Sequence, residues 1–331
     1  MNSTSIEWCN RPETRGLAAA KTWNPIRARL KGAHSKARSG TFCTRISPGC
    51  QHCYASTINK RFGNGLEFTV PNLEKVEFFV DERILEEPLK QKKPCTIFVG
   101  DMFDLFHEAI PDEFIDAVVW VAIEADWHVV QFLTKRAQRM QSYFKNLSAQ
   151  RLRGVCERFK LSPRRSHLKW PFPNLWLGVS IEDQQRHDER VPLLQNTPAA
   201  VRFLSVEPQL EDIRLAIDTP EVGEISTLRG FDGCDPPISG IDWVICGGES
   251  GPGARPFNLA WAESLLTQSR AAGVPFFMKQ VGSHPVWKKD GTFYDQGATH
   301  VWHDRKGGNP AEWPEHLRVR EFPTIREAVS A

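Results

Sequence analysis

Six short apolar runs recur between residues 95 and 279, and they constrain the fold of this chain more than any other feature. Each run is rich in β-branched or aromatic residues and is followed by a polar residue or a glycine, which is the pattern of buried parallel strands. Two amphipathic segments between the runs, 111–125 and 258–273, predict helices, the second with Asn258 as its N-cap and Gly273 as its C-terminal stop. The alternation predicts an α/β fold with a parallel sheet, either open or closed into a barrel. The runs are CTIFVG (95–100), VVQFLT (129–134), NLWLGVS (174–180), VRFLSV (201–206), DWVICG (242–247) and VPFFMK (274–279).

Polar residues stand at the carboxyl ends of nearly all these runs. Parallel strands end at a common edge, and α/β barrels build their active sites at that face, so we expect these side chains to converge there. Strand punctuation alone would also require turn residues, but it would not require so many charged ones. The residues concerned are Gly100, Asp101, Lys135, Arg136, Ser180, Glu182, Glu207, Gly247, Gly248, Glu249, Ser250, Lys279 and Gln280.

The stretch CTRISPGCQHC, residues 43–53, holds three of the eight cysteines of the chain. A structural zinc site normally closes with four ligands, so zinc would need a fourth ligand from elsewhere. A catalytic cysteine needs one thiolate beside a base, which leaves two thiols without a role. A four-iron cluster bound by three thiolates leaves one iron open to a small molecule. All three kinds of site are compatible with these residues.

The net charge of +2 conceals an uneven distribution, because no acidic residue occurs between Glu13 and Glu67, a stretch with ten Lys and Arg residues. A second basic run, 151–170, has seven Lys and Arg residues and one Glu. Clustered cations attract phosphate groups in a salt-sensitive manner, although each run can also be solvated loop surface. The two runs predict a polyanionic partner.

No window resembles a membrane span, and the start, MNSTSIEWCN, lacks the layout of a secretory signal. We therefore expect a cytoplasmic protein without a membrane partner. In that compartment cysteines are reduced thiols or metal ligands rather than a disulfide framework. The five cysteines outside 43–53 are scattered singly, as small buried residues often are.

The cysteine stretch and the βα pattern that follows it resemble the radical S-adenosylmethionine enzymes. Their usual spacing is C-x3-C-x2-C, and this chain shares the final C-x2-C but has three extra residues in the first gap. Over nearly its whole length, the chain is similar to the phage-associated three-Cys-motif family, which is related to radical S-adenosylmethionine proteins such as spore photoproduct lyase. In this chain RARLKGAHSKARSG (27–40) separates the tryptophan motif from the cysteines, as an insertion would. The segments that carry the similarity are TWNPI (22–26), CTRISPGCQHCYA (43–55), GDMFDLF (100–106), FLTKRAQRM (132–140), LWLGVSIEDQ (175–184), RFLSVEP (202–208), WVICGGESGPGARP (243–256), AAGVPFFMKQVG (271–282) and GGNPAEWPEHLRVREFP (307–323).

The resemblance implies a partial or distorted (β/α) TIM barrel of the radical S-adenosylmethionine type over residues 1–285, with the cysteine loop 43–53 and a basic insertion at 151–172. Residues 286–331 would then form an irregular C-terminal extension packed on the barrel. Cys43, Cys50 and Cys53 would hold a 4Fe-4S cluster, whose open iron would bind S-adenosylmethionine and give a 5'-deoxyadenosyl radical.

The resemblance also suggests roles for the residues at the strand ends. Cofactor contacts are expected from Tyr54, Asp101, Lys135, Ser180, Glu182, Gly247, Gly248 and Glu249. Glu207, Lys279 and Cys246 are the candidate catalytic residues, although Lys279 could instead form an ion pair and Cys246 could be a buried structural thiol.

The expected function is that of a radical S-adenosylmethionine enzyme that modifies or repairs a nucleic acid base or nucleotide. It would take electrons from a reductant such as flavodoxin or ferredoxin, and a genomically neighbouring protein is a possible partner. The alternatives are a zinc-stabilised nucleic-acid-binding protein without catalysis and a radical enzyme with a small-molecule substrate.

Overall fold

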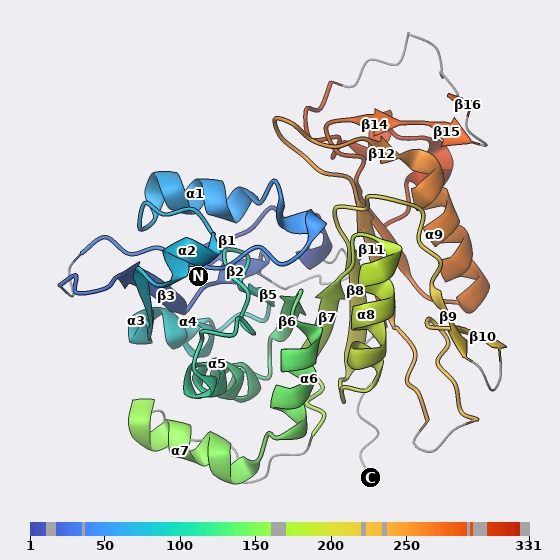
Figure 1. The fold of residues 1–331 in the computed structure, drawn as a ribbon. Coiled ribbons are helices and arrows are strands. Elements are labelled where there is room, and N and C mark those ends of the chain that lie inside the picture. Colours follow the sequence, from blue (N-terminus) through green and yellow to red (C-terminus); the bar gives the residue numbers. More distant parts are fainter. Residues whose placement is uncertain are drawn as a thin grey trace. The chain divides into compact units, whose positions relative to one another are not determined.

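The computed structural model describes residues 1–10, 18–34, 37–159, 170–219, 223–233, 237–289, 292–293 and 303–324 (Figure 1). The chain forms two compact units. Unit 1 comprises Met1–Leu177 with Thr197–Ala200, and unit 2 comprises Gly178–Asn196 with Val201–Ala331. Several residues that the sequence analysis counted or included in a range lie outside the described residues, namely Arg15, Lys36, Cys234, residues 160–169 of the basic insertion, and residues 290–291, 294–302 and 325–331 of the C-terminal extension.

Unit 1 contains a short parallel sheet with one antiparallel edge strand. Strand β1 (Asn2–Ser3) pairs antiparallel with β2 (Lys21–Trp23), which runs parallel to β5 (Thr96–Val99), and β5 runs parallel to β6 (Val129–Thr134). Val99 lies opposite Trp23 on one side and Phe132 on the other, and all three side chains are buried. The strands are therefore apolar because the sheet lies inside the unit.

Helices complete the lower half of unit 1 in the view of Figure 1. Helix α5 (Asp112–Glu124) buries ten of its thirteen residues, which is typical of a helix inside a domain rather than on its surface. It packs against α7 (Ala149–Phe159), while α6 (Ala137–Lys145) follows directly after β6. The segment that joins β4 (Val76–Val80) to β5 contains two short helices, α3 (Glu82–Leu85) and α4 (Glu87–Lys90).

In unit 1, the cysteine loop lies in the connection between the two strands of an antiparallel ribbon. The ribbon consists of β3 (Ile26–Leu30) and β4 (Val76–Val80), and the loop is followed by α1 (Tyr54–Phe62) and α2 (Val70–Leu73). Two turns of 3-10 helix also occur in this unit, η1 (Glu7–Cys9) and η2 (Pro48–Cys50). A buried apolar cluster joins the ribbon, the loop and α1, and its members are Ala28, Phe42, Ala55, Phe68 and Val76.

Unit 2 contains three neighbouring parallel strands, in which β11 (Trp243–Gly247) lies between β8 (Val201–Val206) and β13 (Phe276–Gln280). All five residues of β11 are buried. Helix α8 (Gln184–Gln195) precedes β8, and α9 (Leu259–Ala272) packs against β11 and β13. The predicted ends of α9 are confirmed, because the Asn258 side chain accepts a hydrogen bond from Ala260 N and Gly273 has a left-handed φ of 70°.

The C-terminal segment pairs with the outer edge of β13. Met278 N donates to Val319 O over 2.8 Å, and Glu321 N donates to Phe276 O over 2.9 Å. Phe322 packs against Trp243 and Phe277, with ring centroids 5.5 and 5.2 Å apart. An edge strand that is covered in this way is not available for pairing with another chain.

Unit 2 also contains several small elements. They are the ribbon β9 (Ala216–Thr219) with β10 (Gly223–Ser226), the parallel pair β12 (Phe257–Asn258) with β14 (Pro285–Val286), the pair β15 (Lys288–Lys289) with β16 (Thr292–Phe293), and the 3-10 helices η3 (Pro310–Glu312) and η4 (Glu315–Leu317).

One predicted strand remains to be described, β7 (Leu175–Ser180). The boundary between the two units falls inside it, after Leu177. At its start Asn174 O accepts a hydrogen bond from Val130 N in unit 1, and after its end Ile181 N donates to Ser205 O in unit 2. The predicted α/β class with a mainly parallel sheet is confirmed. Among the described residues the strand order is open in each unit, and no closed barrel is formed.

None of the described helices combines the length and apolarity needed to cross a bilayer.

Two glycine-to-alanine substitutions should change stability in opposite directions. In β7, a Cβ at Gly178 would lie 2.5 Å from two ring carbons of the buried Phe203, so Gly178→Ala should lower the free energy of unfolding by about 1–3 kcal/mol. In α7, a Cβ at Gly154 would meet nothing within 4 Å, so Gly154→Ala should raise it by about 0.5–1 kcal/mol. Urea denaturation of both variants measures this, and an unchanged or raised stability of Gly178→Ala would contradict the packing described for β7.

Candidate functional site

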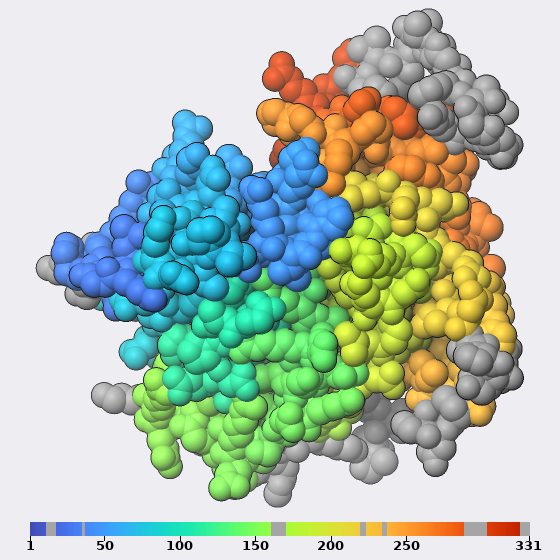
Figure 2. All heavy atoms as spheres, viewed as in Figure 1, coloured from blue at the N-terminus to red at the C-terminus, as the bar shows by residue number. Residues whose placement is uncertain are grey.

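The cysteine loop is fixed at both ends to the turn that follows β5. Before the loop, the Thr41 hydroxyl donates to Met102 O over 2.8 Å, and after it the Tyr54 hydroxyl donates to Asp101 O over 2.5 Å. The loop therefore lies over the carboxyl ends of the parallel strands of unit 1. The loop and α1, blue in Figure 2, reach the surface of the molecule.

The three cysteines of the loop are half-buried. Cys43 and Cys53 pack against the same apolar cluster, and Cys50 ends η2 with its Sγ 3.7 Å from Ser47 Oγ. Burial raises the pKa of the Cys43 thiol to about 12, the Arg136 cation acts to lower it, and negative charge on Cys50 or Cys53 would raise it further. Among the described residues, no three Cys, His, Asp or Glu side chains are already arranged as a metal site. Metal binding would thus require the thiols to turn toward one another and to release their protons.

Arg136, which follows β6 and is 6% exposed, contacts the cysteine loop directly. Its Nη1 donates to Cys43 Sγ over 3.6 Å and to Asp104 Oδ2 over 3.2 Å. Its Nη2 donates to the carbonyl and hydroxyl oxygens of Thr44 over 3.2 and 3.0 Å, and its Nε donates to Glu108 Oε2 over 2.8 Å. The guanidinium therefore joins the loop, the turn after β5 and the end of β6.

His107 supports the same loop as a neutral imidazole. Its Nδ1 accepts a hydrogen bond from Ala109 N over 3.1 Å, so the neutral ring carries its proton on Nε2, which lies 3.0 Å from Thr44 Oγ1. Burial, followed by the charge of Arg136, lowers the pKa of His107 to about 4. The ring is thus held uncharged at neutral pH.

Two further predicted residues lie at this edge of unit 1. The Asp101 carboxylate accepts a hydrogen bond from Asn24 Nδ2 over 2.6 Å, and burial raises the pKa of Asp101 although that hydrogen bond opposes the shift. The backbone N of Lys135 donates to Asp104 Oδ2 over 3.1 Å. The backbone carbonyl of Asp101 therefore contacts Tyr54, directly after the cysteine loop, whereas the Asp101 side chain binds Asn24.

In unit 2, the strand ends bring Glu207, Lys279 and Gly247 together. Lys279 Nζ lies 3.1 Å from Glu207 Oε1, and Ser205 Oγ donates to Glu207 Oε2 over 3.2 Å. A Cβ at Gly247 would lie 2.5 Å from Glu207 Oε1, so this carboxylate depends on the absence of a side chain there. The side chains of Glu207 and Lys279 retain 13% and 22% exposure, which leaves both accessible to a ligand.

The other predicted carboxylates of unit 2 form ion pairs. Glu182 is fully buried, and Arg190 Nη1 donates to its Oε2 over 3.0 Å and to Ser180 O over 2.7 Å. Glu249 is held by Arg255, whose Nε and Nη2 donate to its two carboxylate oxygens over 3.0 and 2.8 Å. Glu182 and Glu249 therefore bind arginine side chains within the unit.

Cys246 and Gly248 lie in the packed interior of unit 2. Cys246 is fully buried with its Sγ 3.2 Å from Gln209 Oε1, and burial, followed by the charge of Glu207, raises the pKa of its thiol. A Cβ at Gly248 would lie 2.6 Å from Val281 O, so glycine is required there for backbone packing.

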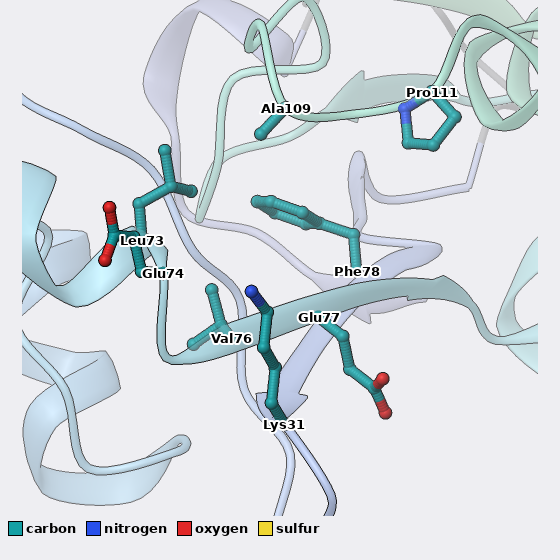
Figure 3. A pocket seen from close by; sticks show the side chains of 8 residues that line it. All are labelled: Lys31, Leu73, Glu74, Val76, Glu77, Phe78, Ala109 and Pro111. Atoms are coloured by element: carbon teal, nitrogen blue, oxygen red, sulfur yellow. The ribbon is translucent and has the colours of Figure 1, made fainter.

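A shallow pocket of roughly 370 Å³ lies in unit 1 beside the β3–β4 ribbon (Figure 3). It combines the charges of Lys31, Glu74 and Glu77 with the ring of Phe78 and smaller apolar groups. The remaining lining residues are Leu73, Val76, Ala109 and Pro111. None of the predicted site residues lines it.

Sequence reasoning gave no role to several residues that build the loop site. Arg136 stood among the strand-end polar residues without a role, and Asp104 stood inside the GDMFDLF motif. Thr44, His107 and Asn24 carried no signal of their own. Asp104 could have been found, because an acidic residue a few positions after a buried strand meets the same criterion as Asp101.

Comparisons with known proteins place the chain in one family. A family model described as "Protein of unknown function (DUF5131)" matches residues 3–308. The searches of curated proteins and of solved structures found no match.

The buried neutral His107 should make stability depend on pH. The unfolded chain binds a proton near pH 6.5 and the folded one near pH 4, so the contribution of His107 is complete above about pH 6.5 and is lost as the pH falls toward 4. His107→Asn keeps an acceptor for Ala109 N. The difference in unfolding free energy between wild type and this variant should shrink by roughly 3 kcal/mol between pH 7 and pH 4. Urea titrations along this range measure it, and parallel profiles would contradict the burial of a neutral ring.

Proposed function

The chain belongs to the family described as "Protein of unknown function (DUF5131)", and from its own residues we propose that it is a radical S-adenosylmethionine enzyme acting on a nucleic acid base or nucleotide. One observation supports this most. Three thiols stand in one loop that is fixed over the carboxyl ends of parallel strands. The proposal includes a partial (β/α) barrel of the radical S-adenosylmethionine type.

The residues of the loop suit an iron–sulfur cluster. Cys43, Cys50 and Cys53 would hold it, and thiolates are the ligands that such clusters use. The apolar cluster under Cys43 and Cys53 would limit access of water. When bound, the cluster and S-adenosylmethionine would supply one-electron cleavage of a carbon–sulfur bond and a 5'-deoxyadenosyl radical. The surrounding side chains would then orient the cofactor and exclude water.

Other residues can be given roles in binding. Tyr54 follows Cys53 directly, and its hydroxyl holds the turn that contains Asp101, so both can position a ligand next to the loop. In unit 2, Glu207 and Lys279 offer one acceptor and one cation for a polar substrate or cofactor group. Glu182 and Glu249 would act through Arg190 and Arg255, by supporting the strand ends.

The remaining predicted roles are unchanged. Lys135, Ser180, Gly247 and Gly248 remain candidates for cofactor contacts, and Cys246 remains a candidate hydrogen donor. A reductant such as flavodoxin or ferredoxin, a neighbouring partner protein and a cytoplasmic location also remain part of the proposal.

A zinc-stabilised nucleic-acid-binding protein is the second candidate function. It is favoured by exposed cations and aromatic rings near the cysteines: Tyr54 and Phe62 are 55% and 65% exposed, and the Arg61 guanidinium lies 4.9 Å from the centre of the Phe62 ring. Arg38 and Arg45 are also exposed. Aromatic rings beside cations suit single-stranded nucleic acid, because the rings stack on bases and the cations contact phosphates.

Metal and sulfide content distinguishes the cluster from zinc. Anaerobic reconstitution with iron and sulfide should give about four iron and about four sulfide per chain, with loss of most of both in Cys43→Ala, Cys50→Ala and Cys53→Ala. Cys156→Ala removes a half-buried thiol of α7 and should keep the full content. Addition of dithionite and S-adenosylmethionine should then release 5'-deoxyadenosine. Stoichiometric zinc without sulfide would contradict the enzyme and support the second candidate.

Salt dependence distinguishes a nucleic acid from a small-molecule substrate. Binding of a fluorescent single-stranded oligonucleotide should weaken steeply as the salt concentration rises. The double variant Arg45→Glu with Arg61→Glu should bind the oligonucleotide more weakly than wild type. Its slope of log Kd against log salt should be flatter by roughly one per lost phosphate contact. Lys92→Glu with Lys93→Glu makes the same charge change at the amino end of β5, away from the loop, and should have little effect. Absence of binding by a cluster-loaded protein would favour a small-molecule substrate.

A further inference from the structure

We propose that Arg136 raises the reduction potential of the cluster by donating an N–H to the sulfur of Cys43. This inference rests on the proposed function, because it requires an iron–sulfur cluster in the cysteine loop. It goes beyond that function by assigning a tuning role to a residue that is not a cluster ligand.

The guanidinium has one fixed orientation. Each of its five hydrogen bonds goes to a different acceptor atom, one of them Cys43 Sγ at 3.6 Å. Arginine carries five N–H donors, so none is left over for rotation into another arrangement. On the arginine side, the contact with sulfur is therefore part of a complete set of hydrogen bonds.

The acceptors are themselves held in place. Asp104 accepts from the Thr134 hydroxyl over 2.7 Å, from Phe106 N over 3.0 Å and from Lys135 N over 3.1 Å, in addition to Arg136. Thr44 is the residue after Cys43, so its two contacts with Arg136 keep the ligand-bearing backbone at a fixed distance from the guanidinium. Bound ligands that are oriented in this way tune a metal centre through their hydrogen bonds.

The direction of the effect follows from charge. One-electron reduction, by a flavodoxin-class protein or by dithionite, adds one negative charge to the cluster and its thiolates. A cation that donates an N–H to a thiolate stabilises the more negative state, and it does so strongly because Arg136 is only 6% exposed. Arg136 therefore makes the cluster easier to reduce, whereas the negative charge of Asp104 acts in the opposite direction.

A purely structural role makes a different prediction. If Arg136 only held the loop closed, its removal would lower the amount of cluster but leave the potential of the remaining cluster unchanged. Substitution of Asp104 would then have the same effect on cluster content and potential as substitution of Arg136. A tuning role predicts shifts of opposite sign for these two residues.

The test compares midpoint potentials of reconstituted full-length protein, measured by dye-mediated titration with electron paramagnetic resonance. Arg136→Met should lower the equilibrium constant for one-electron reduction at least about tenfold, which is about 59 mV. Arg136→Lys keeps the charge but not the five-donor geometry and should give a smaller decrease. Asp104→Asn should raise the constant. Arg151→Met breaks a comparable arginine–carboxylate contact, the 2.8 Å hydrogen bond from Arg151 Nε to Asp116 Oδ2, which does not involve the loop. This variant should leave the equilibrium constant for reduction unchanged.

The outcomes separate the two proposals. Suppose that the wild-type protein contains iron and sulfide. An unchanged potential in Arg136→Met, or equal shifts in Arg136→Met and Asp104→Asn, would then overturn the tuning role but not the proposed function. Failure of the wild-type protein to build a cluster overturns both. If Arg136→Met builds too little cluster to titrate, the signs for Arg136→Lys and Asp104→Asn decide the question.

Discussion

Parallel strand pairing is the constraint on which the rest of each unit depends. The strands β5, β6, β8, β11 and β13 are buried, so polar side chains are excluded from most of their length and gather where the strands end. Parallel direction places those ends at one edge in each unit. The cysteine loop and Arg136 meet at the edge of unit 1, and Glu207 and Lys279 meet at the edge of unit 2. Each candidate site is therefore a consequence of how its sheet is built.

Burial of these charges decides which of them can meet a ligand. A buried charge must be paired, and removal of one partner typically costs several kcal/mol. Glu182 and Arg190 satisfy each other in the interior, with side-chain exposures of 0% and 7%. Glu207 and Lys279 are paired as well, but they retain partial exposure. The second pair can exchange partners with a ligand at lower cost, so it is the better candidate for chemistry, although Glu182 and Glu207 both closely follow strands in the sequence.

The sequence was sufficient for features that depend on local pattern. All six predicted strands are present, within two residues at each end, because their apolar runs are short and clearly bounded. The cap at Asn258 and the stop at Gly273 depend on neighbours in the chain and were also predictable. The contact of Arg136 with Cys43 joins residues 93 positions apart, and no periodicity carries that information. The pairing of residues 319–321 with β13 was missed for the same reason, since that tail has no strand pattern.

The positive charge around the cysteine loop acts over two distances. Arg38, Arg45 and Arg61 are exposed, and in physiological salt their field is screened over about 8–10 Å, so they influence a polyanion that lies on the surface. Arg136 is buried and is screened far less, so its charge acts strongly on the neighbouring Cys43 thiol. One basic region would therefore serve both proposed purposes without conflict, because surface cations would set the affinity for a phosphate backbone while the buried cation would set the energy of an added electron. Salt separates the two contributions, since only the surface one is weakened by it.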